Sequence, residues 1–139
     1  MRKFIALILF AFAGCKTSVN HPAITISLVN QKQHLQISGI NNEILADVAR
    51  DSSATVWQSL VPVYKMPADT TLKNLQPVQP GAYTVKSAVL TFKPDTPFLK
   101  GAVYFVRAYR YNQDSRLADL VTGRLRAGQI PFTDLIFKQ

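Results

Sequence analysis

Residues 102–111 read Ala-Val-Tyr-Phe-Val-Arg-Ala-Tyr-Arg-Tyr, and they give the strongest local indication of a fold class in this chain. Two valines and four aromatic side chains fall within these ten residues, with no Gly or Pro among them. Residues of these types favour strands, whose successive side chains point to opposite faces. We therefore predict a β-strand here, with Tyr104, Val106 and Ala108 facing inward.

Shorter segments of the same character surround this strand. Residues 23–38 alternate apolar and polar side chains on either side of a polar turn at 30–32, which predicts a hairpin or the first two strands of a sandwich. Further strands are predicted at 55–65, 83–92, 116–125 and 132–137. Pro62 cannot donate a hydrogen bond to a neighbouring strand, so it places the 55–65 strand at a sheet edge or at a switch between sheets.

One segment has a different periodicity. Within residues 41–50, Ile44, Leu45 and Val48 recur at helical spacing after an asparagine at 41 or 42 that can cap a helix. The pattern predicts a short helix, with an extended stretch as the alternative.

Residues 66–81 form the longest predicted connection. Pro67, Pro77 and Pro80 interrupt it, and Leu72 and Leu75 are its expected anchors in the core. Many short strands separated by turns favour an all-β sandwich, with a small β-barrel as the alternative.

Residues 89–108 resemble the region between the fifth and sixth strands of bacterial immunoglobulin-like and fibronectin-III-like domains. The matching positions are Leu99, Gly101, Tyr104, Val106 and Ala108. The resemblance implies an immunoglobulin-like β-sandwich in which the Tyr104 hydroxyl bonds back to upstream backbone. It also implies that Trp57, on the third predicted strand, is buried in the core.

The N-terminus has the order of an export signal. Arg2 and Lys3 precede ten apolar residues at 4–13, which are too few to span a membrane. The stretch Phe-Ala-Gly-Cys ending at Cys15 resembles a lipobox, although a Leu is usual where this chain has Phe12. A competing cleavage site is the Ala-Phe-Ala sequence at 11–13.

The lipobox resemblance implies that Cys15 carries fatty acyl chains, such as palmitate, and that residues 1–14 are removed. Two acyl chains are enough for stable membrane anchoring. Residues 15–22 are then a lipidated tether, and residues 23–139 form a single β-sandwich domain. The segment after Cys15 starts with Lys16 and has no acidic residue before Glu43, which favours the periplasmic face of the outer membrane, with the cell surface as the alternative.

Charge adds a constraint on partners. The 125 residues from Cys15 onward hold all eight acidic side chains and all basic ones except Arg2 and Lys3, so their net charge is about +6. A basic surface favours polyanionic neighbours, which for an exported protein are lipid head groups or glycans rather than nucleic acid. The alternative is that the charge only keeps the domain soluble.

The 102–111 strand also supplies the candidate partner surface. If Tyr104 faces inward, Phe105, Arg107, Tyr109 and Tyr111 share the opposite face. Aromatic residues and arginine are enriched at interaction sites. The alternative is that a loop or the C-terminal strand covers this face.

No catalytic, metal-binding or cofactor motif is found in the sequence. His21 and His34 have no neighbouring acid or cysteine, and known nucleophile and metal motifs are absent. The pairs Asp47/Asp51 and Asp114/Asp119 are better explained as solvated surface residues.

We therefore expect a non-enzymatic, membrane-anchored envelope lipoprotein without a cofactor, acting as a binding or structural module for another envelope protein or a glycan. The alternatives are an accessory subunit of a secretion or envelope-assembly machine and a hydrolase acting on envelope material.

Overall fold

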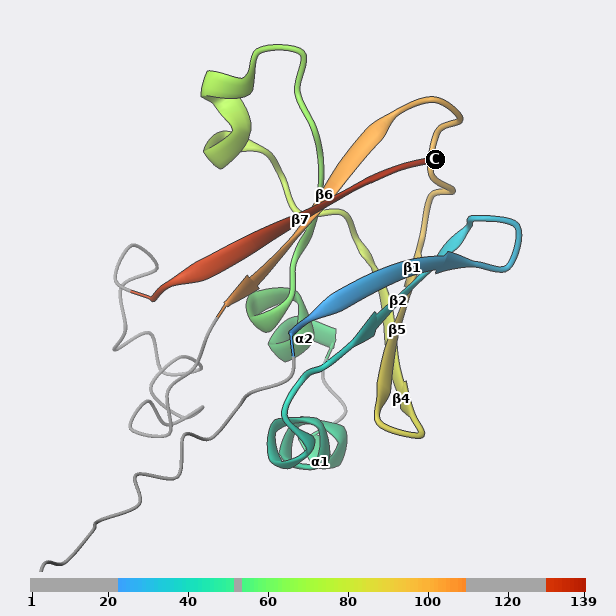
Figure 1. Cartoon of the computed structure of the whole chain (residues 1–139), viewed down its shortest axis with the longest axis vertical. Helices are drawn as coiled ribbons and strands as arrows, with labels where there is room; N and C mark the ends of the chain where they lie inside the picture. Colours follow the sequence, from blue (N-terminus) through green and yellow to red (C-terminus); the bar gives the residue numbers. More distant parts are fainter. Residues whose placement is uncertain (1–22, 52–53, 110–129) are drawn as a thin grey trace, which may run out of the picture.

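The computed structural model describes residues 23–51, 54–109 and 130–139 (Figure 1). Cys15, the tether, Tyr111 and the strand predicted at 116–125 lie outside these residues.

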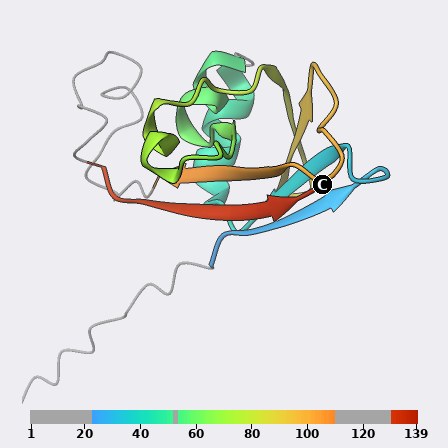
Figure 2. The same cartoon turned by 90° about the horizontal axis from the view of Figure 1, so that it is seen from above.

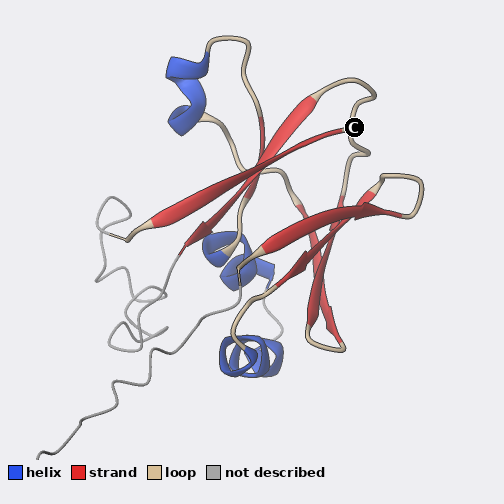
Figure 3. Cartoon of the chain, in the orientation of Figure 1, coloured by secondary structure: helices blue, strands red, loops and turns tan. Residues whose placement is uncertain are grey.

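The described residues form mostly β structure, in two antiparallel sheets with few helices (Figure 3). The four-stranded sheet has the order β1 (Thr25–Val29), β2 (His34–Ser38), β5 (Val89–Pro94), β4 (Gly81–Lys86), and the three-stranded sheet has the order β3 (Val63–Lys65), β6 (Val103–Tyr109), β7 (Phe132–Lys138). The helices are α1 (Asn42–Asp51), α2 (Ala54–Leu60) and the 3₁₀ helix η1 (Thr70–Leu75). In the view of Figure 2, α1 and α2 lie on the same side of strands β1 and β7.

The hairpin predicted in residues 23–38 is confirmed. Strands β1 and β2 pair antiparallel, with Leu28 opposite Leu35. Residues Asn30, Gln31 and Lys32 of the turn all have positive φ angles, between 51° and 63°. Strand β2 then pairs with β5, which brings Leu35 opposite Phe92 in the middle of the sheet.

The single strand predicted at 83–92 is wrong. These residues belong to a hairpin of β4 and β5, in which Val85 lies opposite Leu90. Ser87 and Ala88 form the turn with φ angles of 51° and 61°. Two-residue turns with positive φ normally use Asn or Gly, so this sequence lacks the usual signal for a turn.

The helix predicted at 41–50 is confirmed as α1. The side chain of Asn41 accepts a hydrogen bond from the backbone N–H of Glu43 at 2.7 Å, which satisfies a donor at the helix start. Leu45 and Val48 bury one face of the helix.

The strand predicted over 55–65 is wrong for most of its length. Residues 54–60 form helix α2, and only β3 is extended, directly after Pro62 at the edge of its sheet. Trp57, Leu60 and Val61 are buried and lie three and four residues apart, so a helix places all of them against the core. This burial outweighs the β preference of the individual side chains. Trp57 is therefore buried as predicted, but on a helix.

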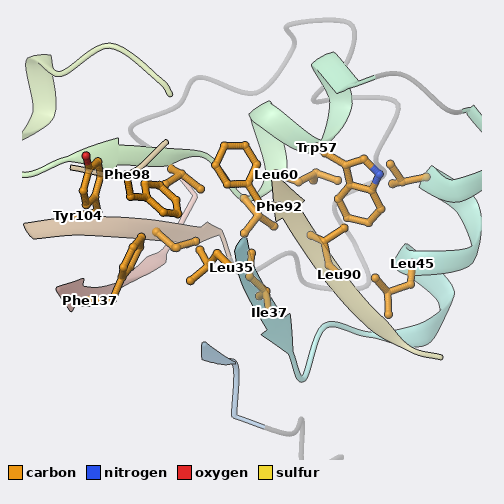
Figure 4. Close-up of a cluster of buried hydrophobic side chains, with 14 residues drawn as sticks. Leu35, Ile37, Leu45, Trp57, Leu60, Leu90, Phe92, Phe98, Tyr104 and Phe137 are labelled. Atoms are coloured by element: carbon orange, nitrogen blue, oxygen red, sulfur yellow. The ribbon is translucent and has the colours of Figure 1, made fainter. Parts of the chain in front are cut away.

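One buried cluster joins both sheets and the two α-helices (Figure 4). Trp57 and Leu45 lie at one end of this cluster, and Tyr104 and Phe137 lie at the other. Phe98 connects the ends, because its ring centroid lies 6.3 Å from that of Phe92 and 4.7 Å from that of Tyr104.

Tyr104 combines a buried ring with a satisfied hydroxyl. It is 2% exposed, and its hydroxyl accepts a hydrogen bond from the backbone N–H of Leu99 at 2.9 Å. The predicted bond to upstream backbone is thus present. Gly101, between these two residues, has a φ of 79°, which suits glycine in this tight connection.

We predict that Tyr104→Phe lowers the free energy of unfolding by about 1–3 kcal/mol, because the Leu99 N–H loses its acceptor in a partly buried site. Urea unfolding measures the change. The matched control is Tyr64→Phe, since the Tyr64 hydroxyl has no hydrogen bond among the described residues. Equal effects of the two substitutions would contradict a role for the Tyr104 bond.

Candidate interaction surface on the β3–β6–β7 sheet

Strand β6 is buried on both faces. Tyr104 and Val106 belong to the main cluster, whereas Phe105 and Arg107 on the other face are 0% and 8% exposed. The expectation that Phe105 and Arg107 form an open partner surface is therefore wrong, and the alternative of a covered face holds for them. Residues of η1, β3 and β7 cover this face. Tyr109 is half-buried, and Tyr111 lies outside the described residues.

A polar network fills the covered face. We call it the Arg107 network, and its members are Arg107, Asp134, Lys73 and Asn74. The Nε and Nη2 atoms of Arg107 donate to the two carboxylate oxygens of Asp134 at 2.8 and 3.0 Å. Lys73 Nζ lies 2.7 Å from Oδ2 of the same carboxylate, and Arg107 Nη2 also donates to Asn74 Oδ1 at 2.9 Å. Strands β6 and β7 position the ion pair directly, because Arg107 lies opposite Asp134 in their register.

Aromatic rings surround the cations of this network. The guanidinium of Arg107 lies 4.0 Å from the ring centroid of Phe132, and Lys73 Nζ lies 4.6 Å from that of Phe105. The rings of Tyr64 and Phe105 stack at 5.0 Å. Cation–π contacts of this kind stabilise charges that are removed from water.

The charges of the network reinforce one another. Burial alone would raise the pKa of Asp134, but hydrogen bonds and charges from Arg107 and Lys73 outweigh it and hold that pKa below its ordinary value. The hydrogen bond to Asp134 is also the main reason that the pKa of Arg107 is raised. Burial raises the pKa of Tyr64, beside them. Both shifts favour the charged forms of Arg107 and Asp134, so this ion pair persists at neutral pH and makes the network a structural clamp.

The helix η1 is fastened to the sheet by this clamp and not by apolar burial. None of its residues is buried, and Lys73 and Asn74 reach the sheet from it. Leu72 and Leu75 are 45% and 77% exposed, so the expectation that they anchor the connection in the core is wrong. Figure 3 shows η1 apart from the other two helices. Residues three apart share one face of a 3₁₀ helix, so the two leucines form an outward ridge.

Two of the described polar residues that the sequence singled out, His34 and Asp47, lie on β2 and α1 and not on this sheet. Across 23–51, 54–109 and 130–139, no three His, Cys, Asp or Glu residues gather as metal ligands. His34 is part of the first hairpin, where its ring lies 3.4 Å from the side chain of Asn30. Asp47 lies 3.7 Å from Arg50 on exposed helix surface. In the same part of the chain, no helix is long and apolar enough to cross a membrane.

The sequence pattern singled out Phe105 and Arg107 and left open that the C-terminal strand covers them, but it did not identify the individual covering residues. Phe132, Asp134 and Ile136 alternate on β7, and antiparallel pairing places them beside Tyr109, Arg107 and Phe105. Asp134 is an acidic residue in a mostly apolar strand, and this pattern could have indicated that it pairs with a buried arginine. Lys73 and Asn74 gave no such indication, because their position depends on the path of the long connection.

Comparisons with protein-family models, with curated proteins and with solved structures give no match for this chain.

The lowered pKa of Asp134 gives a pH-dependent prediction. Its ion pairs stabilise the fold fully above the unfolded pKa of about 4, and this contribution is lost as the pH falls through the lower folded pKa. Asp134→Asn should lower the free energy of unfolding by about 2 kcal/mol at neutral pH, because Arg107 and Lys73 lose the carboxylate that both of them contact. The difference in free energy of unfolding between this variant and the wild-type chain should become smaller below about pH 4.

Urea unfolding across this pH range measures both effects. The matched control is Asp47→Asn, whose side chain is 58% exposed and whose ion pair is long, so its effect should stay near zero. If Asp134→Asn lowers the free energy of unfolding equally at every pH, altered side-chain packing accounts for the change, and the loss of charge does not.

Proposed function

We propose that this chain is an exported lipoprotein, anchored through Cys15, whose immunoglobulin-like sandwich is a binding or structural module for another envelope protein or a glycan. We further propose the periplasmic face of the outer membrane as its location. The anchor is inferred from the sequence, and the role as a module is inferred from the geometry of the described residues.

Strand order supports the immunoglobulin-like assignment. Lettered in chain order from A to G, the sheets have the orders A-B-E-D and C-F-G, which are those of a constant-type immunoglobulin domain. Tyr104 lies near the start of the sixth strand, and its hydroxyl bonds to backbone of the preceding connection, as a tyrosine corner does. Helices α1 and α2 are then an insertion between the second and third strands.

A binding role is supported mainly by two exposed leucines on η1, Leu72 and Leu75, which we call the leucine ridge. The Arg107 network holds the helix in place through its polar side chains, while both leucines remain outside the core. Large apolar side chains that stay exposed on a fixed surface element bury little area within the fold and are suited to an interface. A hydrolase would need a nucleophile or an acid–base pair, and the described residues of this surface provide a structural ion pair.

The anchor is tested at the cysteine. Cys15→Ser should abolish incorporation of labelled palmitate and leave the precursor uncleaved at this site, because no other cysteine is present. Metabolic labelling followed by gel analysis measures both. Absence of label from the wild-type chain would overturn the lipoprotein assignment.

The module is tested at the leucine ridge. Leu72→Ser combined with Leu75→Ser should keep the stability of the wild-type chain within about 0.5 kcal/mol, because neither side chain is buried. The double variant should lose partners that co-purify with the wild-type chain from chemically cross-linked envelopes. The matched control is Leu99→Ser, which replaces a leucine that is 54% exposed in a different connection. Identical partners for the wild-type chain and the double variant would contradict the assignment of the ridge.

A further inference from the structure

Strand β7 is the outer strand of its sheet among the described residues. It pairs with β6 over seven consecutive residues, without a bulge or a proline. Natural proteins usually interrupt, shorten or cover such edges, because a regular edge strand is a template for another strand. The other edge of this sheet, β3, has three residues and a bridge from Tyr64 to Val78.

The backbone N–H and C=O groups of successive residues in a strand point alternately to its two sides. Val103 and Arg107 of β6 bond to the β3 side, through Met66 N–H and the Pro62 carbonyl. Tyr104 and Val106, which alternate with these residues, therefore bond to β7, where their partners are Phe137 and Leu135. The N–H and C=O groups of Asp134, Ile136 and Lys138 consequently point away from β6.

The same three residues present side chains on one face of the edge. Ile136 is 60% exposed and apolar, and it stands between an acidic and a basic residue. Asp134 accepts three hydrogen bonds or ion pairs from Arg107 and Lys73. Because a carboxylate has about four acceptor sites, one site is left for a further donor. Lys138 is exposed.

We propose that β7 pairs antiparallel with β7 of a second copy of this chain, around a two-fold axis at Ile136, and so joins two sheets into one of six strands. This inference goes beyond the proposed envelope function and does not depend on Cys15.

The order of the side chains selects this partner and this register. Pairing around Ile136 packs the two exposed isoleucines together and places Asp134 of each copy opposite Lys138 of the other. Opposite charges on directly paired residues stabilise antiparallel strands. Pairing around Asp134 instead places two carboxylates face to face, and pairing around Leu135 places Ile136 opposite Asp134. Parallel pairing in register places like charges together.

An interface of one strand pair is small compared with that of a stable dimer, which buries about 1,200–2,000 Å² in total. The proposed dimer is therefore concentration-dependent. Tethering both copies to one membrane raises their effective concentration and favours the same contact.

Cysteine cross-linking tests the register in the full chain carrying Cys15→Ser, so that the introduced cysteine is alone. Ile136→Cys should form a disulfide-linked dimer under mild oxidation, because directly opposite residues in a hydrogen-bonded pair have Cα atoms about 5.5 Å apart, within disulfide range. Phe132→Cys, also on the exposed side of β7, should remain monomeric, since its two copies would lie about 27 Å apart along the strands.

Sedimentation over a range of concentrations tests the association without cysteines. The full chain should shift from monomer to dimer as concentration rises, and Ile136→Lys should remain monomeric, because it places two like charges on the axis. A circular dichroism spectrum matching that of the wild-type chain shows that the variant is folded. A wild-type chain that stays monomeric, or that pairs β7 only with a different protein, overturns the proposal. Equal cross-linking of Phe132→Cys and Ile136→Cys does so as well.

Discussion

The burial of β6 on both faces is the constraint on which the rest of the structure depends. One face supplies Tyr104 and Val106 to the main cluster, so both sheets must close over it. The other face carries Phe105 and Arg107, and an arginine can be withdrawn from water only with a partner. Asp134 on β7 provides that partner, and the long connection between β3 and β4 has to return over the sheet to complete it. The path of this connection therefore follows from a single charge in an otherwise apolar strand.

The covered face also explains why the exposed apolar residues of this sheet lie at its periphery. The centre is occupied by the ion pair of Arg107 and Asp134 among aromatic rings, so few charged or polar groups remain there to bind a ligand. Leu75 on η1 and Ile136 on β7 lie outside that centre and are more exposed than polar Arg107 or Asp134. The contacts that we propose with other molecules therefore involve helix η1 and a strand edge, and not the broad face of the sheet. The two positions are distinct enough to be changed independently.

The sequence predicted those features that follow from local pattern. Strand β6, the first hairpin and helix α1 have the expected periodicity, and the hydroxyl bond of Tyr104 follows from a local resemblance. Helix α2 was missed because its β-branched and aromatic residues prefer strands, and only the position of the core requires a helix there. The exposure of Leu75 and the burial of Arg107 were missed for a similar reason. Both depend on contacts between residues about 30 positions apart, which no local pattern contains.

The left-handed turns have a consequence for the order in which the chain folds. Ser87 and Ala88 both adopt positive φ, a conformation that disfavours residues other than Gly and Asn by roughly 1–2 kcal/mol each. The β4–β5 hairpin therefore gains nothing from its own turn and is a poor nucleus in isolation. Strand β5 is held on its other side by β2, whose hairpin with β1 also turns through three left-handed residues. Neither hairpin is favoured locally, so the four-stranded sheet depends on non-local contacts for its formation, and such topologies fold slowly for their size.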